Sequence, residues 1–285
     1  MLRWGSSRPV VRLAMLASGA LLVSCAPQGT ALEVDRTPAN AAPPPIHPSF
    51  SLDAGALDDL LAGAPEPVGT AVRDDPNGFL SRLESVLDEP ADLTILVDKN
   101  HPLPADYVPE DLVNLDTLSG ELSLSRPGHR LRHEATEALR EMSAAAARDG
   151  ITLTVSSPYR SYEYQVVVYS RWVEQLGQEA ADRVSARPGT SEHQLGTAVD
   201  FGCICDEFAE HPAGRWMQDH AYRFGYSLSY PHGYEHVTGY SYEPWHYRYI
   251  GRAATALKRE YFAGIQQWLL EFLHAHRAAL KDARV

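Results

Sequence analysis

Four side chains of this sequence could together hold and use a catalytic metal ion. His193 and Asp200 lie seven residues apart, and Glu243 and His246 lie three apart. A catalytic zinc typically takes three protein ligands and leaves its fourth position to water, with a further acid or base close by. Two imidazoles and two carboxylates can supply that set, although chemistry alone leaves open which carboxylate is the ligand and which is the base. The sequence therefore predicts a metallohydrolase.

The residues around these side chains indicate how they could meet. Gly196 allows a turn, so that a loop carrying His193 can fold back beside a strand carrying Asp200. By itself that pair would more often be ordinary polar surface than a pair of ligands. Pro244 lacks a backbone N–H and restricts Glu243, which disfavours a helix there. We therefore expect the second stretch to be extended or turning and to present both of its side chains to one cavity.

Several separate motifs, in the right order, resemble the VanY-type D-alanyl-D-alanine carboxypeptidases. These enzymes belong to a wider group of zinc peptidases that also includes L,D-carboxypeptidases and D-Ala-D-Ala dipeptidases. The resemblance covers most of residues 94–251. It is loose over residues 100–104 and 107–109, and close over residues 157–162, Gln165, residues 188–200 and residues 243–251.

The resemblance implies that His193, Asp200 and His246 bind Zn²⁺ and that Glu243 is the general base. The implied activity is removal of the terminal D-amino acid from peptidoglycan stem peptides. An L,D-carboxypeptidase acting on tetrapeptides would use the same catalytic set with a different pocket. A zinc domain that binds cell-wall peptides without cleaving them is a third alternative. Glu243 argues against it, because a pure binder needs no base beside the metal.

A carboxypeptidase must also recognise a free terminal carboxylate. The planar fork of Arg suits this task, and Arg160 follows a predicted strand and matches the substrate Arg of the family. Ser191 and Gln165 are expected to assist by hydrogen bonding, and Tyr240 is a candidate for the pocket wall or an oxyanion contact. The alternatives are a surface ion pair for Arg160, a turn role for Ser191, and a scaffold role for Gln165 and Tyr240.

Other polar residues near the motifs have simpler explanations. Trp245 is expected to pack in the core, and Arg248 to brace a nearby carboxylate or backbone carbonyl. Four further histidines lack a partner at a convincing spacing and are expected to have surface or satisfied polar roles. They are His211, His220, His232 and His236.

The N-terminus is typical of an exported protein. Arg3, Arg8 and Arg12 precede an apolar run over residues 13–23, which matches a secretory signal and is short for a membrane span. The run ends before Cys25 in a sequence that resembles the lipobox of bacterial lipoproteins. Residues 1–25 are therefore predicted to be a lipoprotein signal with lipid on Cys25, which would anchor an extracytoplasmic enzyme in a membrane. The alternative is a plain secretory signal.

Cys203 and Cys205 remain once Cys25 is assigned to lipid. Only one residue separates them, so a disulfide would need a tight turn. A structural pair, joined or free, is favoured over a second metal site, because no other ligand pair completes one.

Composition narrows the class of partner. The chain has 285 residues, 44% hydrophobic and 22% charged, as expected of a globular protein. Its formal charge is −12 and no basic stripe is visible. A nucleic-acid partner is therefore not expected, since phosphate binding needs clustered Lys and Arg.

Residues 26–75 are rich in Pro and small residues and predict a flexible tether. One short helix around Leu57 could form within it and dock on the domain. The catalytic domain is expected over residues 76–285, with its core from about residue 93. Helices are predicted over residues 79–87, 131–148, 162–176, 216–224 and 252–283, and strands over residues 93–97, 151–155, 226–230 and around residue 245. Because helices and strands mix without regular alternation, we predict one compact α+β domain with a small central antiparallel sheet flanked by helices.

Overall fold

The computed structural model of the chain describes residues 43–285. The predicted signal and the lipidation at Cys25 lie outside the described residues, as does the first part of the predicted tether. Within the described range, no helix combines the length and the apolar character needed to cross a bilayer.

The described residues contain a five-stranded sheet in the order β2-β4-β5-β7-β6. The four strands from β4 to β6 pair antiparallel, and β2 adds a parallel edge. The α+β class and the small central sheet are therefore confirmed. The strands are β2 (Ser123–Leu124), β4 (Thr154–Ser157), β5 (Ala198–Phe201), β6 (Tyr226–Leu228) and β7 (His246–Tyr249). A separate antiparallel pair is formed by β1 (Leu112–Asn114) and β3 (Arg130–Arg132).

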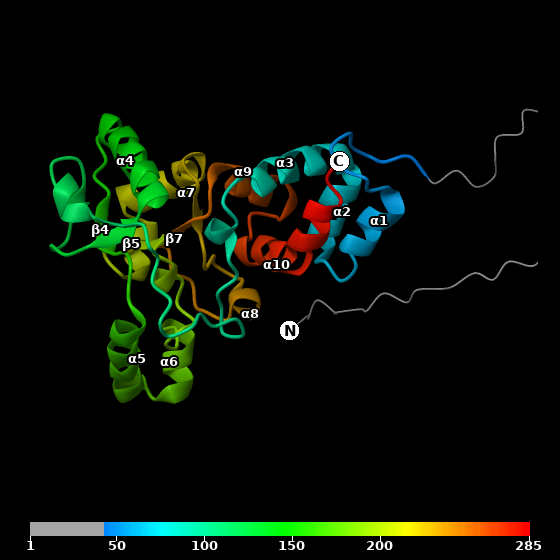
Figure 1. Ribbon diagram of the computed structural model, residues 1–285. Helices are drawn as coiled ribbons and strands as arrows, with labels where there is room; N and C mark the ends of the chain where they lie inside the picture. Colours follow the sequence, from blue (N-terminus) through cyan, green and yellow to red (C-terminus); the bar gives the residue numbers. More distant parts are fainter. Residues whose placement is uncertain (1–42) are drawn as a thin grey trace, which may run out of the picture.

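The alternation of side chains along β5 separates the core from the candidate site. Val199 and Phe201 belong to a buried apolar cluster together with Tyr247 of β7. Because successive strand residues point to opposite faces, Asp200 and His246 are left on the other face. The cluster is completed by two helices that lie close to the sheet in Figure 1. They are α4 (His133–Arg148) and α7 (Pro212–His220).

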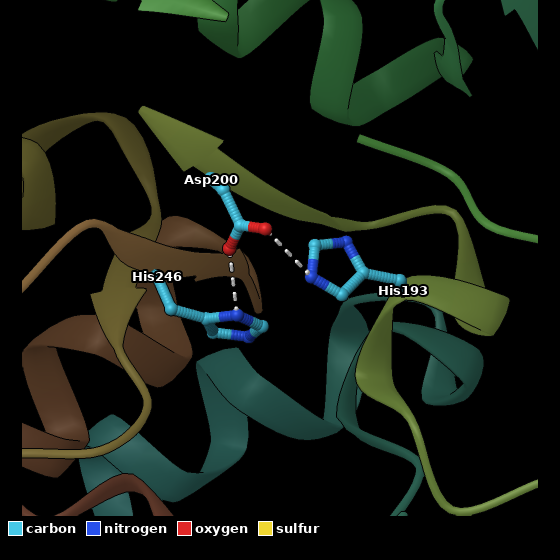
Figure 2. Close-up of side chains that lie close together, drawn as sticks. All are labelled: His193, Asp200 and His246. Carbon is cyan, nitrogen blue, oxygen red and sulfur yellow. Dashed lines mark hydrogen bonds and ion pairs between the residues drawn. The ribbon is translucent and has the colours of Figure 1, made fainter. Parts of the chain in front are cut away.

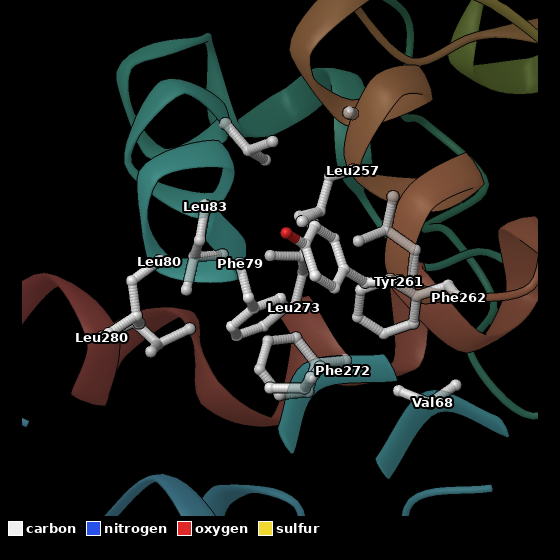
Figure 3. Packing of buried hydrophobic residues seen from close by; sticks show 14 of the residues in the cluster. Val68, Phe79, Leu80, Leu83, Leu257, Tyr261, Phe262, Phe272, Leu273 and Leu280 are labelled. Atoms are coloured by element: carbon white, nitrogen blue, oxygen red, sulfur yellow. The ribbon is translucent and has the colours of Figure 1, made fainter. Parts of the chain in front are cut away.

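Helices from both ends of the described chain form a second apolar cluster (Figures 1 and 3). They are α1 (Ala54–Leu60), α2 (Glu66–Asp74), α3 (Pro76–Asp88), α9 (Arg252–Tyr261) and α10 (Gln266–Asp282). The tether prediction is therefore wrong for residues 46–74, and the core does not begin near residue 93. Phe50, Val68 and Val72 are fully buried, but their partners lie about 200 residues away, where local composition cannot reveal them.

Two further predictions need correction. Residues 93–97 do not form a strand, since Ala91–Thr94 is a 3₁₀ turn and the carbonyls of Leu93 and Ile95 accept hydrogen bonds from the Arg248 guanidinium. The long C-terminal helix is broken into α9 and α10. The break occurs at Ala263 and Gly264, which both have positive φ angles incompatible with a continuous right-handed helix.

A helical hairpin projects from the sheet half of the molecule, as Figure 1 shows at its lower edge. It consists of α5 (Tyr162–Leu176) and α6 (Gln178–Val184). The Ser161 side chain caps α5 by accepting from the Tyr164 N–H, and Gly177 ends the helix with a positive φ. The remaining short helix, α8, covers Glu235–Thr238. The predicted helices over residues 131–148 and 162–176 are confirmed.

The second cluster generates a prediction about stability. Phe79 packs against Tyr261 and Phe272, with ring centroids 5.3 and 5.8 Å away (Figure 3). We expect Phe79→Ala to lower the free energy of unfolding by about 3–5 kcal/mol, because removing the ring would leave a cavity in a well-packed site. Phe79→Leu, which keeps most of the volume, should cost less than about 2 kcal/mol. Urea unfolding of both variants tests this, and an unchanged midpoint for Phe79→Ala would show that the cluster contributes little.

Candidate active site

Three side chains converge on the face of the sheet opposite its apolar cluster (Figure 2). The pairing of β5 with β7 sets Asp200 directly opposite His246, and Asp200 Oδ1 lies 3.0 Å from His246 Nδ1. Asp200 Oδ2 lies 3.3 Å from His193 Nε2. One ligand atom from each residue falls within 4.8 Å of the others, and all three side chains are buried.

A turn positions His193 against this pair. Residues Glu192–Leu195 form a 3₁₀ turn that ends at Gly196, which has a left-handed φ of 68°. This left-handed conformation favours glycine, and a Cβ at Gly196 would also lie 2.9 Å from the end of the Leu112 side chain. The predicted turn between His193 and Asp200 is present.

The group fits a zinc ion in its donor atoms and in their outer partners. His193 Nδ1 lies 2.7 Å from the carbonyl oxygen of Pro158, and His246 Nε2 lies 3.1 Å from Glu192 Oε2. Each ring can therefore donate its outer N–H and leave a lone pair facing Asp200. Metal-binding histidines are usually oriented in this way, and two imidazoles with one carboxylate leave a fourth position open.

Glu243 lies beside this group, as predicted. Its Oε2 is 3.6 Å from His246 Nδ1, and the side chain is 14% exposed. Burial raises the pKa of Glu243 to about 7, and this outweighs the opposing effect of His246. The stretch before β7 is not helical, so Pro244 is accommodated and Glu243 and His246 face the same space.

Arg160 is held at the same site by neutral partners. Its guanidinium donates to Gln165 Oε1 at 2.8 Å and to Ser157 Oγ at 3.0 Å, while Asp200 Oδ2 is 3.6 Å away. No surface acid pairs with Arg160 among the residues described. Gln165 itself is buried and donates to the carbonyl of Ala186 at 2.6 Å. Gln165 therefore lies behind Arg160 and does not line the cavity. From the sequence, Gln165 had been expected to contact the substrate.

A cavity of about 480 Å³ joins these groups. Ser191 and Tyr240 line it together with Arg160 and Glu243. Burial raises the pKa of Tyr240, which keeps its phenol protonated and able to donate a hydrogen bond. Trp245 also lines the cavity and packs partly against the core cluster.

Glu192 is the main residue that sequence analysis overlooked. It is 3% exposed, and its carboxylate accepts from Arg248 Nη1 at 2.9 Å and from Ser229 Oγ at 2.6 Å. Burial alone would raise the pKa of Glu192, but Arg248 and His246 outweigh it and hold the pKa at about 2. The bracing role predicted for Arg248 is confirmed. Arg248 lies two residues after His246 on the same strand face, and this position was a signal that a buried carboxylate lay nearby.

Tyr230 was also overlooked. Its ring centroid lies 4.8 Å from that of His246, and the residue lines the cavity. By contrast, His232 and His236 border a separate hollow, and neither belongs to the metal-type group found among the described residues. Cys203 and Cys205 are joined by a disulfide.

Comparison with known proteins identifies related carboxypeptidases. The family described as VanY, D-alanyl-D-alanine carboxypeptidase, matches residues 128–252. A D-alanyl-D-alanine carboxypeptidase of Enterococcus faecalis is 34% identical over 200 residues, which cover 66% of this chain and 70% of that protein. The putative carboxypeptidase YodJ of Bacillus subtilis is 38% identical over 175 residues. That match covers 59% of this chain but only 63% of YodJ, less than two thirds of its length.

Solved structures of carboxypeptidases are also similar to this chain. The LdcB LD-carboxypeptidase superposes with a TM-score of 0.55 at 35% identity, covering 63% of this chain and 85% of that one. A vancomycin-resistance D,D-pentapeptidase VanY in complex with Zn(II) gives 0.51 at 34%, covering 64% and 99%. The fold is that of a zinc peptidase, and the buried His-Asp-His group could hold the metal. More narrowly, the chain belongs to the VanY-type D-alanyl-D-alanine carboxypeptidase family.

The buried contacts of Glu192 generate a prediction about metal binding. Glu192→Gln removes the charge behind His246 and leaves Arg248 without its anionic partner. We expect zinc affinity to fall by about 10- to 100-fold, as it does when other outer partners of ligating histidines are lost. Competition with a chromophoric chelator measures this directly.

Glu134→Gln is the matched control, since Glu134 is an exposed acid on α4. Circular dichroism of the metal-free proteins separates loss of affinity from loss of fold. Unchanged zinc affinity in folded Glu192→Gln would refute the positioning role.

Proposed function

We propose that this chain is a zinc-dependent carboxypeptidase that removes the C-terminal D-amino acid from peptidoglycan stem peptides. In this proposal His193, Asp200 and His246 hold Zn²⁺ and Glu243 is the general base. The observation that carries it is the presence of a fixed guanidinium, Arg160, in the same cavity as a metal-type group and a carboxylate with a raised pKa.

Arg160 supports an exopeptidase in particular. Two neutral partners orient its guanidinium, and its ion pair with Asp200 is long, at 3.6 Å. Such a group can bind the terminal carboxylate of a peptide in a bidentate pair. An internal peptide bond has no carboxylate to offer. Binding there would set the last peptide bond over the metal group, with Gln165 acting through Arg160.

The other side chains have complementary roles in this proposal. Glu243, with a pKa near neutrality, takes a proton from the attacking water and returns it to the leaving amine. Zn²⁺, when bound, acidifies water and polarises the carbonyl. Tyr240 and Ser191 donate hydrogen bonds to the substrate from the cavity wall. Excluding bulk water from the buried site strengthens each of these interactions.

Location and substrate stereochemistry belong to the same proposal. Export by the N-terminal signal, with lipid on Cys25, would bring the enzyme to the wall peptides. A related structure, VanYB, is described in complex with D-Alanine-D-Alanine, which favours D,D cleavage. The likeness to LdcB, described as an LD-carboxypeptidase, supports L,D cleavage of tetrapeptides as the second candidate.

Product analysis on defined substrates tests the activity. We expect the zinc-loaded protein to release one terminal residue from a pentapeptide stem ending in D-Ala-D-Ala, and a chelator to abolish the release until zinc is restored. Mass spectrometry of tri-, tetra- and pentapeptide stems gives the products. Preferential loss from the tetrapeptide would select the L,D alternative, and no chelator-sensitive loss from any stem would refute a carboxypeptidase.

The general base has its own test. Glu243→Gln should lower kcat by about 10²- to 10⁴-fold, because the amide cannot accept the proton from water. Zinc content and peptide affinity should remain, since Glu243 is not among the proposed ligands. The exposed Glu134→Gln again serves as the control. Full turnover by Glu243→Gln would contradict the assignment.

A further inference from the structure

Lys99 contacts three groups at the edge of the candidate active site. Its ammonium donates to the carbonyl oxygen of Asp182 at 2.6 Å and to that of Gly239 at 2.5 Å. It also lies 4.5 Å from the centroid of the Tyr240 ring. Asp182 belongs to the last turn of α6, and Gly239 ends α8. One cation therefore binds carbonyls at the C-terminal ends of two helices, where such groups lack partners within the helix.

The turn that carries Lys99 is anchored from α10. The Asp98 carboxylate accepts from the backbone N–H of Asn100 at 2.8 Å, with Lys99 between the two residues. The Gln267 side chain of α10 donates to the other oxygen of Asp98, also at 2.8 Å. Asp98 and Gln267 are both buried. Because α10 lies outside the family match over residues 128–252, a helix beyond that range fixes the backbone from which Lys99 extends.

Lys99 supplies the cationic contact in the packing around Tyr240. The Tyr240 ring lies 4.9 Å from that of Tyr230, which in turn lies 4.8 Å from that of His246, between ring centroids. Tyr240 is 3% exposed and lines the cavity. The stem of Lys99 covers Gly239 so closely that a Cβ there would lie 3.2 Å from Lys99 Cδ. Lys99 therefore holds both the Tyr240 ring and the carbonyl group that precedes it.

We infer that Lys99 is a positioning residue for the proposed reaction, because it fixes Tyr240 in the cavity wall. A cation over an aromatic face and charge-assisted hydrogen bonds both restrict the groups that they join. A hydroxyl that is already fixed can stabilise charge developing on the substrate without reorganising. Lys99 itself does not line the cavity, so it acts through Tyr240. The inference rests on the proposed function, in which Tyr240 donates to the substrate.

A double-mutant cycle tests whether Lys99 acts through Tyr240. Both kcat and KM are measured on a pentapeptide stem ending in D-Ala-D-Ala, for the zinc-loaded wild type, Lys99→Met, Tyr240→Phe and the double variant. We expect Lys99→Met to lower kcat/KM about tenfold, mostly through kcat, because the hydroxyl acts on the transition state. In the Tyr240→Phe background, which lacks that hydroxyl, the same change should cost less than about twofold.

Fluorine NMR follows the ring itself and does not require turnover. In protein labelled with 3-fluorotyrosine, the resonance missing from Tyr240→Phe belongs to Tyr240. We expect this resonance to shift or broaden in Lys99→Met. It should stay unchanged in the matched control Lys281→Met, because Lys281 is exposed on α10 and does not line the cavity. Lys99→Gln, which keeps a polar side chain but loses the charge, gives the same comparison if the Met variant does not fold.

Three results would overturn the inference. They are an unchanged kcat/KM in folded, zinc-loaded Lys99→Met, an unmoved Tyr240 resonance in that variant, and an equal loss of activity with and without the Tyr240 hydroxyl. The last would show that Lys99 only supports the fold. Urea unfolding and zinc content are measured for each variant, so that differences in stability or loading are accounted for. Absence of cleavage of any stem by the wild type would instead refute the proposed function, and the Tyr240 resonance would still show whether Lys99 holds the ring.

Discussion

The antiparallel register of β5 and β7 is the constraint on which the candidate site depends. It places Asp200 directly across from His246, and the same alternation sends Val199 and Tyr247 into the apolar cluster behind the sheet. A shift by one residue would exchange these faces and bury the two polar groups in the core. The packing that stabilises the sheet therefore also maintains the geometry of the metal-type group.

A buried network then connects this pair to the rest of the protein. Glu192 contacts His246, and Arg248 joins Glu192 to the carbonyls of Leu93 and Ile95. Gln266, at the start of α10, also donates to Glu192, at 2.9 Å. Removing either charged partner would leave an uncompensated ion in the interior, which costs far more than an exposed ion pair contributes. The network thus links the sheet, the segment before it and the second helical cluster through one carboxylate.

Much of the site could be predicted from the sequence because its signals are local. His193, Asp200, Glu243 and His246 occur in short motifs, and period-2 alternation indicates which side chains share a face. Glu192 could not be recognised, because a carboxylate preceding a histidine in a turn looks like solvated surface. Its burial depends on Arg248, more than 50 residues away. The helix around Leu57 was anticipated, but α2 and the burial of residues 46–74 were missed for the same physical reason, since their apolar partners lie near the other end of the sequence.

The arrangement of charged groups in the cavity would determine how a peptide is oriented there. Arg160 is held by hydrogen bonds to Ser157 and Gln165, and it lines the cavity. Glu243 lies beside His246, where burial keeps its pKa near neutrality. A peptide whose carboxylate binds Arg160 therefore presents its last peptide bond to the metal-type group.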